Sequence, residues 1–143
     1  MKTKENHRTM KRYFAAFLLA LACAVPARAA TFTSIPSTAA PASYDVVPAS
    51  FSFVACDNVN GNSFTHTGHE LLLAFNSDAS AHSVTVASVA DLMGRTGDST
   101  KNINGSAYYV FQLFPPAGWR QTDGTIHVTC SDATLKLAVI RFP

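Results

Sequence analysis

The apolar residues of this chain occur in short stretches, and glycine, proline, asparagine or aspartate residues separate these stretches. Beyond residue 30, no window is both long enough and periodic enough to predict an amphipathic helix. Short apolar stretches between turn residues are typical of strands in an all-β domain. The sequence therefore predicts an antiparallel β-sandwich or jelly roll of about seven to eight short strands over residues 51–143.

The same pattern predicts the individual strands and turns. Predicted extended segments are residues 31–35, 51–56, 70–76, 82–90, 107–114, 125–130 and 135–142. We expect turns at residues 57–63, where Asn60-Gly61 suits a positive φ, and at Asp123-Gly124. Residues 76–80 are interpreted as a hairpin connection, the last two strands as a closing hairpin, and residues 91–104 as a long polar loop. Residues 115–119 are expected to break the sheet.

The first 29 residues have the pattern of a secretory signal peptide. Five basic residues within residues 1–12 precede an apolar run over residues 13–25, and Ala27-Arg28-Ala29 provides small residues at alternate positions for signal peptidase. We therefore expect a signal peptide at 1–29, an extended Pro/Ser/Ala-rich segment at 30–50, and export to the periplasm or the cell exterior.

Two other interpretations of this leader are less favoured. An uncleaved membrane anchor would need about 20 apolar residues, and the run is shorter. A lipoprotein anchored through Cys23 is disfavoured because Ala20, not leucine, stands three positions before the cysteine. After cleavage we expect no membrane association.

Removal of the leader changes the charge of the chain. Residues 30–143 contain five basic and eight acidic residues, so the net charge becomes −3. A domain with few cations and no basic cluster lacks the electrostatic surface that binds a phosphate backbone. Nucleic acid is therefore excluded as the main ligand.

The cysteines allow one disulfide in the exported chain. Cys23 leaves with the leader, so Cys56 and Cys130 are the only pair left for an oxidising compartment. A bridge between them would close a large loop and stabilise the fold by roughly 4 kcal/mol. Two buried free thiols remain the alternative.

The residues that carry chemistry do not form a recognisable active site. His66-Thr67-Gly68-His69-Glu70 lacks the His-Glu-x-x-His order of helical zinc sites, and we interpret it as a solvated turn. The loop over residues 57–62 has valine and glycine where a calcium loop needs oxygen ligands. No Gly-x-Ser-x-Gly motif is present. We therefore expect no enzyme activity, no catalytic or metal site and no cofactor.

Two predicted strands are apolar on both faces. In residues 107–114 both alternating sets of side chains are apolar, and residues 135–142 show the same property. A strand in a two-sheet sandwich normally alternates apolar and polar side chains, so something must cover the second face. The cover is either the N-terminal segment or long loop, or another subunit or assembly. Under the second alternative the expected interface residues are Tyr108, Tyr109, Phe111 and Leu113.

A different surface would suit a carbohydrate. Trp119, Tyr108 and Tyr109 are the candidates for an aromatic platform on which a sugar ring stacks, although a single Trp after Pro-Pro also suits a core position. This interpretation predicts an exported, monomeric binding module.

The succession of turns and strands over residues 44–143 resembles small structural proteins of tailed bacteriophages and prophages, of the capsid-decoration or head-associated kind. The residues that carry the resemblance are Asp57-Asn58-Val59-Asn60-Gly61-Asn62-Ser63-Phe64, strands 70–76 and 82–90, Gly94-Arg95-Thr96-Gly97-Asp98, Phe114-Pro115-Pro116, Asp123-Gly124 and the final Leu-Ala-Val-Ile-Arg. The resemblance implies a non-enzymatic β-sandwich that binds a capsid-like shell or oligomerises on it. It would place the protein on a virion surface, whereas the leader predicts export.

Overall fold

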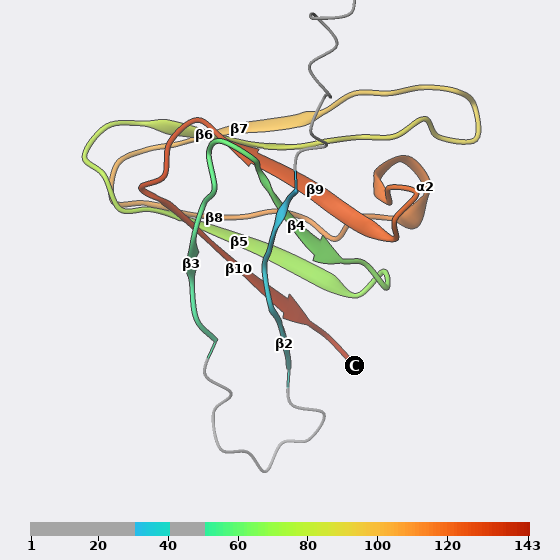
Figure 1. Cartoon of the computed structure of the whole chain (residues 1–143), viewed down its shortest axis with the longest axis horizontal. Helices are drawn as coiled ribbons and strands as arrows, with labels where there is room; N and C mark the ends of the chain where they lie inside the picture. The colour runs from blue at the N-terminus through green and yellow to red at the C-terminus, as the bar shows by residue number, and fades with distance from the viewer. Residues whose placement is uncertain (1–30, 41–50) are drawn as a thin grey trace, which may run out of the picture. The chain divides into compact units, whose positions relative to one another are not determined.

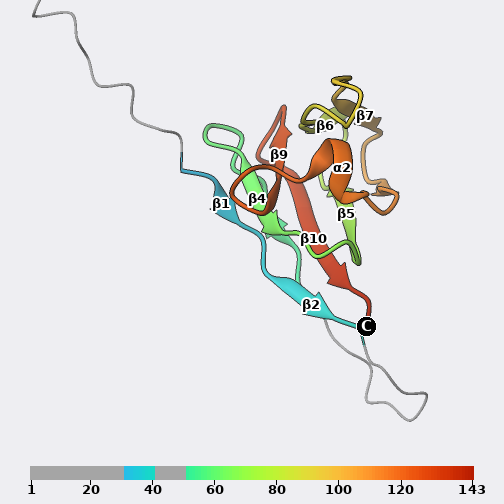
Figure 2. The same cartoon turned by 90° about the vertical axis from the view of Figure 1, so that its right-hand side faces the viewer.

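The computed structural model describes residues 31–40 and 51–143, so the predicted signal peptide lies outside the described residues. The described chain forms two five-stranded sheets that stack as a sandwich, with one short helix, α2 (Pro116–Trp119) (Figures 1 and 2). The predicted all-β sandwich is confirmed, with ten short strands in the described part in place of about seven to eight.

Each sheet takes strands from both halves of the chain. Sheet A contains, in spatial order, β1 (Thr33–Ser34), β4 (Asn62–Thr65), β9 (Thr125–Cys130), β6 (His82–Val86) and β7 (Ser99–Ile103). Sheet B contains β2 (Ser37–Ala39), β10 (Leu135–Arg141), β5 (Glu70–Asn76) and β8 (Tyr108–Val110), and β3 (Val54–Ala55) also pairs with β10. Neighbouring strands are antiparallel, except that β1 is parallel to β4 and β2 is parallel to β10.

The core lies between the two sheets. Along β9 the side chains alternate, so that Ile126 and Val128 are fully buried while the residues between them face outward. Leu72 and Ala74 of β5 are buried in the same way from the opposite sheet. This period of two is the geometric reason that short alternating stretches fold as strands here.

The short connections between long strands cross from one sheet to the other. Asn76–Ser80 joins β5 of sheet B to β6 of sheet A, and the link after Cys130 joins β9 of sheet A to β10 of sheet B. Our prediction of hairpins at both places is therefore wrong. A few residues are enough to span the roughly 10 Å between stacked sheets, so a short polar link does not require that its two strands pair.

The side chain of Asn76 fixes the first of these crossings. Asn76 is fully buried, and its amide nitrogen donates hydrogen bonds to the carbonyl oxygens of Ser80 (2.7 Å) and Ile103 (2.9 Å). Its amide oxygen accepts a hydrogen bond from the backbone N–H of Asp78. The side-chain hydrogen bonds of Asn76 thus hold this connection, whereas a hairpin would be held by backbone hydrogen bonds between its two strands.

Two strands lie where the sequence predicted loops. The predicted turn at residues 57–63 ends at Gly61, which has the expected positive φ of 81°, and β4 begins at Asn62. β7 lies within the predicted polar loop at residues 91–104. Both strands were missed because most of their side chains are polar, and β7 is an edge strand with one exposed face.

Two other predicted strands end early. β6 stops at Val86 instead of residue 90, where the apolar phase of the sequence changes. β8 stops at Val110 instead of residue 114. The shorter β8 allows both Phe111 and Phe114 to turn into the core, where both side chains are buried.

The predicted disulfide between Cys56 and Cys130 is confirmed. Its Cα atoms lie 6.3 Å apart, and the two cysteines are separated by 74 positions in the sequence. Cys130 ends β9 in sheet A, whereas the N–H of Cys56 donates to the carbonyl of Leu135 in sheet B. The bond therefore connects the two sheets, and it points to folding in an oxidising compartment outside the cytoplasm.

Candidate functional site

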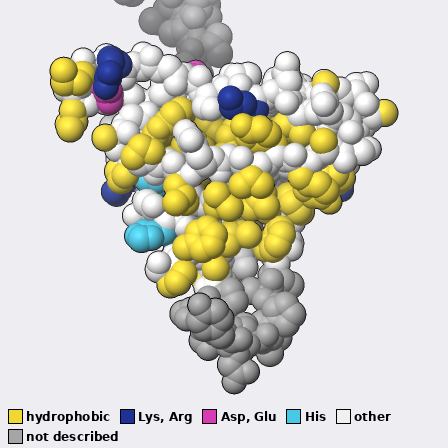
Figure 3. All heavy atoms as spheres, turned by 180° about the vertical axis from the view of Figure 1, so that it is seen from behind, with side chains coloured by type: hydrophobic (Ala, Val, Ile, Leu, Met, Phe, Trp, Pro, Cys, Tyr) yellow, Lys and Arg dark blue, Asp and Glu magenta, His cyan; other side chains and the backbone are white. Residues whose placement is uncertain are grey.

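The outer face of sheet B is built from apolar side chains. We define the apolar face as the outward-facing residues Phe51, Phe53, Leu71, Leu73, Phe75, Tyr108, Val110, Ala138 and Ile140. Of these, Phe51, Tyr108 and Val110 are exposed, Ala138 is buried and the others are half-buried. Strand register places them in rows across the sheet, for example Val110 beside Leu73 beside Ala138. Seen from behind, hydrophobic side chains cover much of the lower half of the described domain (Figure 3).

Aromatic residues at one end of the apolar face contact one another. The rings of Phe75 and Tyr108 stack with their centroids 4.4 Å apart. The ring centroid of Phe53 lies 6.2 Å from that of Phe75 and 6.1 Å from that of Tyr108. Phe51 packs edge-on against Phe53. Phe51 and Phe53 therefore add two aromatic rings to the face but do not shield it, because Tyr108 remains 66% exposed and Val110 54% exposed.

The outer face of sheet A has the opposite character. Its outward positions are Ser63, Thr65, Ser83, Thr85, Thr100, Asn102, Thr125, His127 and Thr129. The hydroxyl groups of Thr85 and Thr100 are hydrogen-bonded at 2.8 Å. Phe32 covers part of this face by stacking on His127, with ring centroids 3.9 Å apart. One surface of the sandwich is thus hydrogen-bonding and the other is apolar.

The four predicted interface residues do not share one face. Tyr108 and Leu113 are exposed, whereas Phe111 is buried in the core and Tyr109 points inward beside it, with ring centroids 4.9 Å apart. Of the four, Tyr108 belongs to the apolar face. The residues that the sequence analysis missed are Leu71, Leu73 and Phe75 of β5, although the run Leu71-Leu72-Leu73 shows in the sequence that β5 is apolar on both faces.

The three residues of the predicted sugar platform point in different directions. Trp119 packs against the core, with its ring centroid 5.2 Å from that of Phe114. Tyr108 stacks on Phe75 on the outer surface, and Tyr109 faces inward. The structure therefore does not bring these aromatic rings together into one platform.

The segment His66–Glu70 is less solvated than the sequence suggested. The Glu70 side chain is 1% exposed, and its carboxylate accepts hydrogen bonds from the Thr67 hydroxyl and from the N–H groups of Thr67, Gly68 and His69. Burial by itself would raise the pKa of Glu70, but these hydrogen bonds outweigh it and hold the pKa below its usual value. The carboxylate thus organises the link between β4 and β5.

His66 has a structural contact as well. It is 3% exposed, and its Nε2 donates a hydrogen bond of 2.8 Å to the carbonyl oxygen of Phe114. Its Nδ1 is buried without a hydrogen-bond partner in the described structure. The expectation of a solvated turn is therefore wrong for His66 and Glu70, whose side chains are buried and hydrogen-bonded within the protein.

The calcium-like loop after Cys56 is held together by hydrogen bonds to the carboxylate of Asp57. The carboxylate of Asp57 accepts hydrogen bonds from the N–H groups of Val59 and Asn60, from the Asn60 amide and from the Thr33 hydroxyl. These bonds lower the pKa of Asp57, with the Asn60 backbone contributing most. Among the described residues, no three His, Cys, Asp or Glu side chains are placed so that they could share a metal ion.

Helix length bears on whether a helix of the described residues crosses a membrane. None of the helices in residues 31–40 and 51–143 is long and apolar enough to span a membrane.

Comparison with known proteins returned no match. No family model, no curated protein and no solved structure matches this chain.

Proposed function

We propose that this protein is a non-enzymatic, exported assembly domain that associates with further copies of itself through the apolar face. The observation that supports the proposal is the contrast between the two outer surfaces of the described domain. The outward positions of sheet B carry large apolar side chains, with Tyr108 and Val110 exposed and Leu73 half-buried, whereas those of sheet A are polar. Such patches on a folded domain mark interaction surfaces because their exposure to water is unfavourable.

The charge on the apolar face favours a second copy as the partner. Lys136 is the one charged residue at the outward positions of β5, β8 and β10, so the face offers little to a strongly charged partner. Lys136 lies beside Phe75 in the last row of the sheet, at one end of the face. Two copies related by a twofold axis can therefore stack while their lysines remain apart.

The size of the face indicates weak association. The seven residues of β5 extend over about 23 Å, and four strands span about 14 Å. A face with these two dimensions has a smaller area than the roughly 800 Å² that each partner buries in a standard interface. We therefore expect association that depends strongly on concentration, as suits a protein whose copies are concentrated on a larger assembly.

Two other proposals for function have less support. The resemblance to phage decoration proteins would make a capsid-like shell the partner of the same face. The sequence analysis based a carbohydrate-binding module on a platform of Trp119, Tyr108 and Tyr109, and this platform lacks support because the three rings point in different directions.

Light scattering over a range of protein concentrations tests the proposal. We expect the weight-average mass to rise between about 10 µM and 1 mM and Val110→Lys to remove most of this rise. The matched control is Thr100→Lys, which adds the same charge to the polar face of the opposite sheet and should associate like the wild type. A wild type that stays monomeric at 1 mM, or a control that loses association equally, would contradict the proposal.

A further inference from the structure

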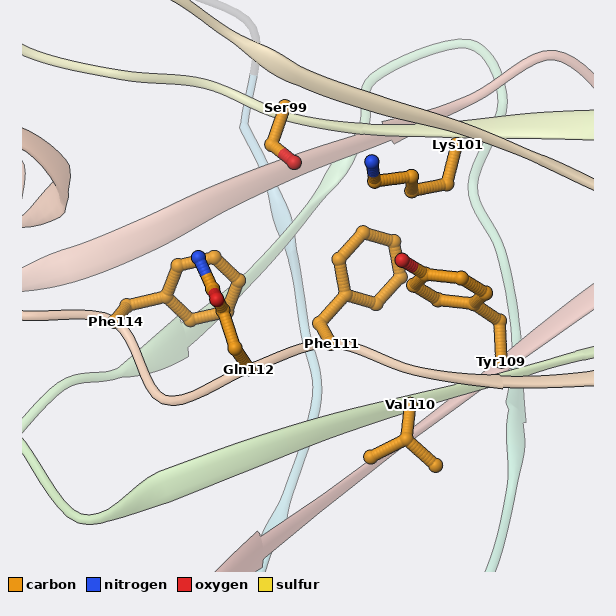
Figure 4. A pocket seen from close by; sticks show the side chains of 7 residues that line it. All are labelled: Ser99, Lys101, Tyr109, Val110, Phe111, Gln112 and Phe114. Carbon is orange, nitrogen blue, oxygen red and sulfur yellow. The ribbon is translucent and has the colours of Figure 1, made fainter.

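A cavity opens between the two sheets where their last strands lie side by side. β7 ends sheet A and β8 ends sheet B, and only residues 104–107 separate them in the chain. The cavity has a volume of about 210 Å³ and is lined by Ser99, Lys101, Tyr109, Val110, Phe111, Gln112 and Phe114. Figure 4 shows these residues from close by.

The floor of the cavity is aromatic. Phe111 and Phe114 are almost completely buried, and their rings lie 6.4 Å apart between centroids. Tyr109 stands beside Phe111, while Val110 points away from the cavity (Figure 4). A floor of this kind offers an apolar surface against which the flat side of a small ring can pack.

Polar groups converge above this floor. The ammonium group of Lys101 and the hydroxyl of Ser99 reach in from β7, the Tyr109 hydroxyl approaches from β8 and the Gln112 amide from the segment after β8 (Figure 4). None of these four side chains has a hydrogen-bond or ion-pair partner among the described residues. A ligand could therefore bind all four groups without breaking a contact of the protein.

The position of Lys101 is unusual for a lysine. It lies opposite Val84 in the strand register, and Val84 is fully buried, so Lys101 points to the inner side of sheet A. An inward charge on an edge strand also protects a sheet against pairing with another sheet. Edge protection requires only the charge, whereas this lysine ends beside other polar groups above an aromatic floor.

We propose that this cavity binds a sugar carboxylate, such as a hexuronate that is free or part of an acidic polysaccharide. One lysine matches one carboxylate, the hydroxyl and amide groups match ring hydroxyls, and the phenylalanines match the apolar side of the sugar ring. A single lysine without arginine or a backbone anion site suits a carboxylate better than a phosphate. The cavity faces the edge of the sandwich and does not depend on self-association through the apolar face.

Trp119 provides the readout for binding. It is the only tryptophan in the chain, and its ring lies 5.2 Å from Phe114, which lines the cavity. The probes are glucuronate and galacturonate, with glucose and galactose as neutral controls and oligogalacturonate to separate a free sugar from a polysaccharide unit. We expect a saturable fluorescence change with the uronates and at least about tenfold weaker binding of the neutral sugars.

Variants assign the binding to the cavity. Lys101→Met keeps most of the side-chain length and should weaken uronate binding at least about tenfold, and Tyr109→Phe should weaken it severalfold. Lys136→Met is the control, because it removes the same charge from the outer face of sheet B and should leave binding unchanged.

Three results would overturn the proposal. The first is no binding of either uronate or oligogalacturonate up to about 100 mM sugar. The second is equal binding of uronates and neutral sugars, and the third is an equal loss in Lys101→Met and Lys136→Met. If Lys101→Met increases the mass in light scattering while the wild type binds no uronate, the lysine protects the sheet edge instead.

Discussion

The two sheets of this sandwich are alike inside and different outside. One row across the outer face of sheet A consists of Thr100, Thr85 and Thr129, and the corresponding row across the outer face of sheet B consists of Val110, Leu73 and Ala138. The inner residues next to these rows are apolar in the long strands of both sheets. The inner faces are what the fold requires, so the outer difference needs a separate explanation.

The comparison separates stability from interaction. Threonine and valine both favour strands, so either row satisfies the local requirements of a sheet. An exposed apolar side chain such as Val110 adds little to the stability of a single domain, but its burial lowers the free energy of a complex when a partner covers it. This contrast supports the proposal that the outer face of sheet B is an interaction surface, and variants of the inner and outer faces test it.

The largest expected effect comes from the disulfide, which links the two sheets. Replacing both Cys56 and Cys130 by alanine should lower the free energy of unfolding by roughly 4 kcal/mol, because the bond restricts a long loop of the unfolded chain. Urea unfolding followed by Trp119 fluorescence measures the change. Reduction of the wild type should give a similar loss, and a much smaller loss would mean that the sheets stay together without the bond.

The next prediction concerns the inner faces. Leu72→Ala in sheet B and Ile126→Ala in sheet A should each lower the free energy of unfolding by about 3 kcal/mol, because both side chains are fully buried. Leu73→Ala, one residue away but facing outward, should cost about 1 kcal/mol or less in dilute solution. Chemical denaturation measures all three, and a loss at Leu73 as large as that at Leu72 would contradict the division between inner and outer faces.

The sequence predicted the fold class and the long strands of both sheets, because these strands carry strong apolar patterns. β5 of sheet B and β9 of sheet A occupy the predicted residues, and the disulfide pairing followed from elimination of Cys23. β7 was missed because Thr100, Lys101 and Asn102 are polar, and a run of polar residues in a sequence is typical of a loop. An edge strand needs hydrogen bonds on only one side, so its sequence carries a weaker signal.

The candidate sites were less predictable. The sequence indicated that a second apolar face exists, but it did not show which of the two alternating sets of side chains faces outward, and Tyr109 and Phe111 belong to the inner set. Because β8 ends at Val110, Phe114 also turns inward, and it forms the floor of the cavity together with Phe111, opposite Lys101. That juxtaposition joins residues from two sheets, and no local pattern in the sequence encodes it.

A smaller effect is expected from Glu70, whose carboxylate holds the link between β4 of sheet A and β5 of sheet B. The lowered pKa of Glu70 means that its ionised form stabilises the folded state above the unfolded pKa near 4.3, and that this contribution is lost as the pH falls through the lower folded value. Glu70→Gln should therefore cost about 2 kcal/mol at pH 7. The difference from the wild type should shrink below about pH 4.

Denaturation at a series of pH values measures this difference directly. Other acidic groups with lowered pKa values, among them Asp123 with a pKa of about 2, contribute equally to both proteins and cancel. Thr67→Val removes one donor and keeps the carboxylate, so it should show a smaller version of the same pH dependence. A difference that stays constant from pH 7 to pH 3 would mean that Glu70 acts through its shape and not its charge.

The smallest change in stability gives the most direct test of the two outer faces. Val110→Thr and Thr100→Val exchange side chains of nearly equal shape at exposed positions of the two edge strands, and each should alter the free energy of unfolding by no more than about 0.5 kcal/mol. Thr100→Val also loses the hydrogen bond to Thr85.

Association should respond unequally, because Val110→Thr places a hydroxyl within an apolar row and weakens self-association in light scattering. Thr100→Val should not strengthen association, since its neighbours Thr85 and Thr129 remain polar. Equal and opposite changes in the two variants would mean that total apolar area, and not the arrangement of one face, determines association.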